Sequence, residues 1–170
     1  MERLLFMLGK MRLNMNIFVL DNCPKASAKM ACDKHVVKMI LESAQMLCTV
    51  ANDKGFESPY KPVHRKHPCT IWVSKSRSNW KWLIEHSMAL CDEYTSRYGK
   101  THKSRAVIEW ASKLNIDLPS AGLTTFAQAM PDQYKRQSAV EAYRLYYLGE
   151  KKRFAKWKFT KEPDWWMEAV

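Results

Sequence analysis

Apolar and polar positions repeat along most of this chain with the period of an α-helix. Between about residues 27 and 52, apolar side chains recur every three or four positions, which places them on one face of a helix. They are Val36, Val37, Ile40, Leu41, Ala44, Leu47, Cys48 and Ala51. Similar spacing predicts a second long helix from about Thr70 to Tyr98, ended by Gly99, and a third near Ser104 to Leu114. We therefore expect a mainly α fold.

Shorter elements flank these helices. The run Asn-Ile-Phe-Val-Leu at residues 16–20 predicts a short N-terminal strand that ends in turn-forming residues. A short helical piece is expected around residues 126–130. Ser138 and Glu141 form a capping box, which begins a last helix ending at Gly149. The pattern predicts one compact, single-domain helical fold.

Other segments carry no clear period. Three prolines forbid regular structure in the long loop between the first two helices, and long loops in compact domains are often functional. The tail after Gly149 is basic and aromatic. Residues 1–14 are expected to be a loosely held extension of a domain over residues 15–170, with Met15 as an alternative start. The apolar run in this extension is too short for a signal core or a membrane span.

Composition suggests a partner. The chain has 28 Lys and Arg against 17 Asp and Glu, a formal charge of +11, and such a field attracts polyanions. Nucleic acid or a phosphorylated nucleotide is the expected partner, and a basic surface without a specific ligand is the alternative. Five cysteines at irregular spacing, with no secretion signal, predict a reducing compartment rather than a disulfide framework. No membrane association is expected.

Candidate chemistry lies on the first long helix. Positions three, four and seven apart share one side of a helix, so His35, Lys38 and Glu42 form a single stripe with Lys34 at its start. An imidazole, an amine and a carboxylate in one line suit acid–base catalysis, because a carboxylate partly withdrawn from water titrates nearer neutral pH. The alternative is an ordinary surface ion pair between Lys38 and Glu42, which contributes only about 0.2–0.5 kcal/mol.

The proline-bearing loop adds four basic residues: His64, Arg65, Lys66 and His67. Arginine can grip a phosphate bidentately, so we expect this loop to hold phosphate or nucleic acid, with a solvated charge run as the alternative. Cys32 and His35 together with the two loop histidines also make a candidate zinc set, because zinc prefers these ligand types. The flanking cations would repel a dication, so neither a metal nor another cofactor is expected.

Further candidates for nucleic-acid contact are Arg97, Lys100, His102, Lys152 and Trp157. Lysines of the tail can meet phosphates while an indole ring stacks on a base. Three alternatives stay open. His86 and Glu93 share the helix face of Arg97 and can form a buried pair, cations after the helix end can complement its dipole, and the tail can pack its aromatic rings onto the domain.

Several stretches of the sequence resemble an uncharacterised family of small bacteriophage proteins. They are CDKHVVKMILESAQML, YKPVHRKHPCTIW, ALCDEYTSRYGK and FAQAMPDQYK, and the similarity covers nearly the whole chain from Met15 onward. This resemblance implies a phage origin and places the protein in the cytoplasm of the infected bacterial host. It assigns no activity.

The order of features is also similar to that of the phage-type pyrimidine-dimer DNA glycosylases. In that family a histidine and a catalytic glutamate lie seven apart on the first helix, as His35 and Glu42 do here. Glu93 precedes Arg97-Tyr98-Gly99, and the aromatic run at residues 143–147 is similar to the C-terminal tract of the family. The resemblance implies a compact, basic, all-α enzyme that acts on DNA.

The chain departs from that family at the nucleophile. Those enzymes attack the sugar with their own N-terminal amine, after the initiating methionine is removed to reveal a small residue. Here Glu2 follows Met1 and Asn16 follows Met15, and neither pair invites removal. Either Lys34 or Lys38 would then have to supply the amine, or Glu42 would activate water instead.

Three functions fit these residues. The leading hypothesis is an N-glycosylase in which Glu42 stabilises the growing positive charge on the sugar and activates water. In it His35 assists as acid or orienter, Lys38 is a candidate amine, and the basic loop holds phosphate. The second is a phage anti-defence protein that binds and sequesters, or degrades, a host signalling nucleotide. The third is a non-enzymatic DNA-binding protein.

Overall fold

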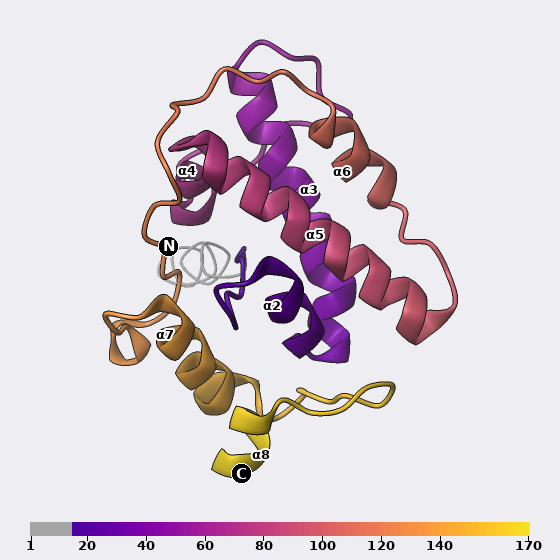
Figure 1. The fold of residues 1–170 in the computed structure, drawn as a ribbon, viewed down its shortest axis with the longest axis vertical. Helices are drawn as coiled ribbons and strands as arrows, with labels where there is room; N and C mark the ends of the chain where they lie inside the picture. The colour runs from indigo at the N-terminus through magenta and orange to yellow at the C-terminus, as the bar shows by residue number, and fades with distance from the viewer. Residues whose placement is uncertain (1–14) are drawn as a thin grey trace, which may run out of the picture.

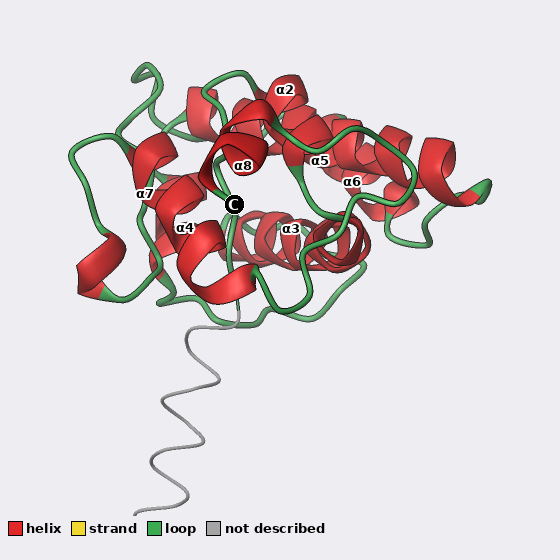
Figure 2. Cartoon of the chain, turned by 90° about the horizontal axis from the view of Figure 1, so that it is seen from below, coloured by secondary structure: helices red, strands yellow, loops and turns green. Residues whose placement is uncertain are grey.

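The computed structural model describes residues 15–170, and the regular elements in that range are all helices, joined by loops (Figures 1 and 2). The elements are α2 (Pro24–Met30), α3 (Asp33–Asp53), α4 (Pro68–Ser74), α5 (Arg77–Tyr98), α6 (Arg105–Ser112), the 3-10 turn η1 (Asp132–Tyr134), α7 (Ala139–Tyr146), the π-helical turn η2 (Tyr147–Lys151) and α8 (Asp164–Ala169). The expected mainly α class is confirmed. The expected extension at residues 1–14 lies outside the described residues.

The two long helices, α3 and α5, form the centre of the fold and cross one another, with α6 packed against both and α2 packed against α5 (Figure 1). The apolar stripe of α3 is buried as its spacing predicts, with Val36, Ile40, Ala44 and Leu47 all inaccessible to solvent. The stripe is narrower than the sequence pattern indicates, because Val37 and Leu41 of the same helix are exposed.

The second predicted helix is interrupted. The chain breaks between α4 and α5 because Ser76 takes an extended conformation, with φ of −156°, and its side chain accepts a hydrogen bond from the Asn79 amide as the N-cap of α5. The other end of α5 is as predicted, with Gly99 in the left-handed conformation at φ of 68°. The helical piece expected around residues 126–130 is wrong, since this stretch is irregular and the turn η1 follows it.

The expected N-terminal strand is also wrong. Residues 16–20 are buried, but no strand pairs with them in the described part of the chain. Side chains take the place of a neighbouring strand, because the Asn16 amide donates to Glu42 and the Leu20 amide donates to the Ser27 hydroxyl. This segment therefore runs through the interior and is held by the helices on either side.

The C-terminal tail folds back on the domain. Figure 1 shows it in yellow near α2 and the start of α3. The Trp157 indole is buried and donates to the Met30 carbonyl at 3.0 Å. The Asp33 amide donates to the Lys156 carbonyl, and the Lys158 amide donates to the Asp33 carboxylate. Trp157 is thus a packing residue here, as the alternative reading of the tail expects, rather than an exposed platform for a base.

Two further observations concern the cysteines and the length and polarity of the helices. All five cysteines are free, and four of them are buried while Cys23 is exposed. Within residues 15–170, each helix is too short or too polar to cross a lipid bilayer.

Candidate active site

Glu42 is a buried carboxylate in the middle of α3, with 7% of its surface exposed. Its Oε2 atom accepts a hydrogen bond from the Asn16 amide at 3.0 Å, and its Oε1 atom lies 3.6 Å from the Lys38 ammonium. Burial raises the pKa of Glu42 to about 7, against the opposing effects of the Asn16 hydrogen bond and the charges of Lys38 and Lys151. A carboxyl group that titrates near neutral pH can both accept and donate a proton under physiological conditions.

The Asn16 amide is fixed in place by its own side chain. The Asn16 Nδ2 atom donates to the Ala129 carbonyl at 2.7 Å, and its Oδ1 atom accepts from the Tyr143 hydroxyl at 2.7 Å. The Cys69 thiol lies 3.8 Å from the same oxygen. These contacts join three distant parts of the chain, and they hold a hydrogen-bond donor against the Glu42 carboxylate.

A cationic pocket of about 190 Å³ lies at the start of α3, on the side of Lys38. Its walls are Phe18, Lys34, His35, Lys38, Met39, Lys151, Arg153 and Phe154. Four of these side chains are cations, two are phenyl rings, and no acidic side chain of the described residues joins them. Lys38 lines the pocket and also pairs with Glu42, so the pocket and the buried carboxylate adjoin one another.

His35 lines this pocket as a neutral imidazole. Its ring stacks on Phe18 with centroids 4.2 Å apart, and its Nδ1 atom lies 2.6 Å from the Tyr147 hydroxyl. Burial, and then the charges of Lys151, Lys38 and Lys34, lower the pKa of His35 to about 3. The imidazole is therefore uncharged at physiological pH, which favours a role as a fixed hydrogen-bonding group over one as a cationic acid.

Lys151 closes the pocket from the C-terminal part of the chain. Its Nζ atom lies 4.5 Å from the centre of the Tyr146 ring, 5.6 Å from that of Phe18 and 5.9 Å from that of Phe154. The pKa of Lys151 is lowered, chiefly by burial, while Glu150 opposes this and Lys38 and Arg153 add to it. Sequence reasoning groups this residue with the other basic residues of the tail, because the π-helical turn that aims it at the pocket leaves no periodic signal.

The basic loop lies elsewhere. Residues 64–68 surround a separate hollow of about 440 Å³, and in the described structure none of them lines the His35 pocket. Arg65 pairs with Asp53 at 2.6 Å and with Asn52 at 3.1 Å. Asp53 ends α3 eleven residues beyond Glu42, which is about 16 Å along the helix axis. His64 and Lys66 are exposed, while His67 is buried and caps α4 by accepting from the Cys69 amide.

The candidate zinc set does not assemble. Cys32 lies beside the His35 site, with its sulfur 3.8 Å from the Tyr147 hydroxyl, but the two loop histidines belong to the other hollow. Over residues 15–170 no group of three or more histidine, cysteine or acidic side chains is arranged to hold a metal ion.

Arg97 stabilises the fold and has no donors left for phosphate, so its expected role in phosphate binding is not supported. Its guanidinium is buried and bonds the carboxylates of Asp33 and Glu93 at 3.1 and 3.0 Å, as well as the carbonyls of Ala31 and Lys29. Glu93 thus pairs with Arg97 rather than with a histidine.

The other predicted cations are spread over the surface. His102 bonds the Val37 carbonyl at 3.1 Å, whereas Lys100 and Lys152 are exposed. Of the predicted catalytic and binding residues, the structure brings together Lys34, His35, Lys38 and Glu42.

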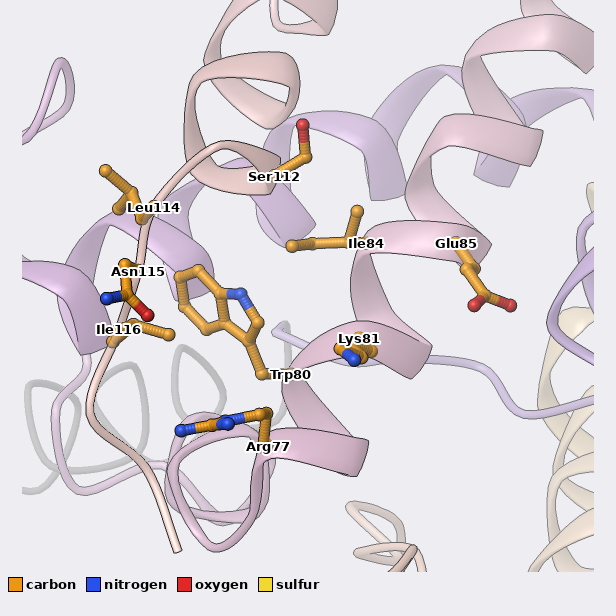
Figure 3. A pocket seen from close by; sticks show the side chains of 9 residues that line it. All are labelled: Arg77, Trp80, Lys81, Ile84, Glu85, Ser112, Leu114, Asn115 and Ile116. Atoms are coloured by element: carbon orange, nitrogen blue, oxygen red, sulfur yellow. The ribbon is translucent and has the colours of Figure 1, made fainter. Parts of the chain in front are cut away.

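A third hollow, of about 370 Å³, lies between α5 and residues 112–116 (Figure 3). Figure 3 shows the Trp80 ring facing this segment, with Arg77 and Lys81 nearby. Glu85, the acidic side chain among its described lining residues, is exposed, and no histidine lines the hollow. It lacks the buried carboxylate of the His35 site, so we place the chemistry beside Glu42.

Comparison with known proteins gives one match. Residues 15–106 match the sequence model of the family described as pyrimidine dimer DNA glycosylase. The matched range contains Asn16, His35, Lys38 and Glu42, and it ends before Lys151. Neither the curated proteins nor the solved structures gave a match.

Proposed function

Since this chain belongs to the pyrimidine dimer DNA glycosylase family, we propose that it is a DNA N-glycosylase that works at the pocket beside Glu42. The observation that carries the proposal is the buried Glu42 carboxyl, whose pKa is about 7, next to a pocket walled by four cations and two phenyl rings. DNA supplies the negative charge and the flat bases that such a pocket suits.

Each wall of the pocket has a role in this reaction. The enzyme must draw a nucleotide out of the stack and stabilise positive charge on the sugar as the base leaves. In this proposal Lys34 and Arg153 contact the flanking phosphates, and a base stacks on Phe18 or Phe154. Ionised Glu42 stabilises the cationic sugar.

His35 and Lys38 act next to this carboxylate. His35 is neutral, so it orients the sugar or the leaving base by hydrogen bonding rather than by delivering a proton from an imidazolium. The Lys38 ammonium holds one oxygen of Glu42, and the Asn16 amide holds the other. The Asn16 amide thus positions the carboxylate.

The size of the pocket favours a DNA substrate over a free nucleotide as the ligand. Sites that enclose a whole small ligand typically have volumes of about 300–1,000 Å³. The His35 pocket, at about 190 Å³, is smaller. It suits part of a nucleotide that is held in place by the rest of a DNA strand better than a free signalling nucleotide.

The test uses an end-labelled duplex that carries one cyclobutane pyrimidine dimer, with an undamaged duplex as control. After incubation, hot alkali converts each abasic site into a strand break that is read on a gel. We expect breaks at the dimer alone. Glu42→Gln should slow base release by about 100-fold or more and leave DNA binding intact, and the exposed Glu57→Gln should be active. Tight binding by the unaltered protein without base release would refute the proposal and indicate a non-enzymatic DNA-binding protein.

A further inference from the structure

Two apolar side chains of α3 face solvent, although the period of the helix predicts that they are buried. Val37 and Leu41 are 38% and 42% exposed, whereas Val36 and Ile40 are inaccessible to solvent. Because they lie four positions apart, Val37 and Leu41 are neighbours on the helix surface and form one apolar ridge. Apolar surface that stays in water contributes nothing to folding, so packing of the domain does not explain the ridge.

The ridge adjoins the candidate active site. Leu41 precedes Glu42 in the sequence and lies three positions after Lys38. Lys38 lines the His35 pocket and pairs with Glu42 at 3.6 Å. Residues three apart on a helix are surface neighbours, so Leu41 stands beside a lysine that borders the pocket. A DNA strand that reaches the pocket therefore runs alongside the ridge.

Four exposed lysines lie around the ridge. Two are on α3 itself, and two are on the turn between α5 and α6, where the His102 Nε2 atom lies 3.1 Å from the Val37 carbonyl oxygen. The two acidic residues in this part of α3, Asp33 and Glu42, are buried, and each pairs with a cation. An apolar centre among cations matches duplex DNA, in which phosphates flank stacked bases. The four lysines are Lys34, Lys38, Lys100 and Lys103.

The phenyl rings of the pocket are less suited to enter a base stack. Phe18 is 6% exposed and its ring stacks on that of His35, with centroids 4.2 Å apart. Phe154 is partly buried, with the Lys34 ammonium 4.8 Å from the centre of its ring. Both rings are held within the pocket, whereas Leu41 projects from the surface beside it.

We propose that Leu41 is a wedge that enters the base stack beside the damaged nucleotide, with Val37 supporting it. The inference rests on the proposed function and supplies the step that delivers the nucleotide to the pocket. An enzyme that acts on a base in a duplex must first unstack and unpair it. Leucine is among the side chains that proteins insert between base steps to unstack them. Leu41 fills the gap while the surrounding lysines hold the phosphates.

Fluorescence of 2-aminopurine tests whether the ridge opens the duplex, because this base is quenched while stacked and brightens when unstacked. It is placed in the base pair next to a cyclobutane pyrimidine dimer, and anisotropy of a labelled duplex shows that each protein is bound. We expect the fluorescence to rise with the unaltered protein and with Leu41→Met, which keeps a long apolar side chain. It should stay low with Leu41→Ala, and an equal rise with that variant overturns the proposal.

Base release is then compared on the dimer duplex and on a single strand with the same dimer. Leu41→Ala should be slower than the unaltered protein by about 10-fold or more on the duplex, where unstacking is no longer offset. A single strand has no paired stack to open, so there the two proteins should agree within about twofold. Equal losses on both substrates overturn the proposal, because they indicate general damage to the site. Leu123→Ala, at an exposed leucine outside the pocket, should match the unaltered protein on both.

The two readouts separate this inference from the proposed function. Base release by the unaltered protein, with full duplex activity and full fluorescence of Leu41→Ala, refutes the wedge and leaves the glycosylase proposal standing. A fluorescence rise that depends on Leu41, without base release from either substrate, refutes the glycosylase proposal and supports the wedge. Where the unaltered protein acts on the duplex alone, the fluorescence of Leu41→Ala decides.

Discussion

Replacing Glu42 by glutamine should stabilise the protein in alkaline solution. Glu42 is buried, and burial raises its pKa from the ordinary 4.5 to about 7. Above that pH the folded protein must hold a buried negative charge that the unfolded chain exposes to water. Glutamine has almost the same shape, can still accept the Asn16 hydrogen bond, and carries no charge.

The size of the effect follows from this pKa. A group whose pKa is raised on folding favours the folded state at low pH, and this contribution is lost as the pH rises from the unfolded value of 4.5 through the folded value of about 7. Each pKa unit corresponds to about 1.4 kcal/mol. The unfolding free energy of Glu42→Gln should therefore gain about 3 kcal/mol on the unaltered protein between about pH 4.5 and about pH 8.

Urea unfolding at several pH values across this window measures the difference between the two proteins. His35 and His86, whose pKa values burial lowers from 6.5 to about 3 and about 4, also change the stability within this window, up to about pH 6.5. They are present in both proteins, so their contributions cancel. Glu57→Gln, at an exposed position, should show no such gain. A stability difference that does not change with pH would mean that Glu42 is solvated in the folded protein, and it would remove the basis for its catalytic role.

Three further substitutions test other parts of the structure by the same unfolding assay. Arg97→Ala should cost about 3–5 kcal/mol, because two partly buried carboxylates lose their partner, and a loss below about 1 kcal/mol would show a solvated pair. Tyr143→Phe should cost about 1–3 kcal/mol and slow base release, since the Asn16 side chain loses a buried donor, whereas unchanged stability would contradict that clamp. Gly149→Ala should cost about 1–3 kcal/mol because its new methyl group overlaps the Tyr134 ring, and the same cost in a Tyr134→Ala background would refute that cause.

Helix geometry explains which part of the site can be predicted from the sequence. His35, Lys38 and Glu42 lie on one helix, and the spacing along a helix fixes which side chains share a face. The placement of the basic loop depends instead on a tertiary contact. Nothing near Arg65 in the sequence shows that it pairs with Asp53, at the end of α3, rather than folding over Glu42.

Long-range packing explains the features that the sequence does not show. Residues 16–20 run through the interior because their backbone bonds to side chains such as Glu42 and Ser27. An apolar run in the sequence does not show whether its backbone bonds to a neighbouring strand or to side chains. Lys151 reaches the pocket because the chain passes through a π-helical turn before the tail returns to α2 and α3. Its neighbour Lys152, equally basic in sequence, faces solvent.

The site is built from two parts of the chain, and only the first lies in the segment that the family model matches. Asn16, His35 and Glu42 fall inside the segment shared with the family, whereas Lys151 and Phe154 lie more than forty residues beyond its end at residue 106. Substitutions in the C-terminal part of the chain can therefore alter the walls of the pocket without changing any residue of the segment that the family model matches.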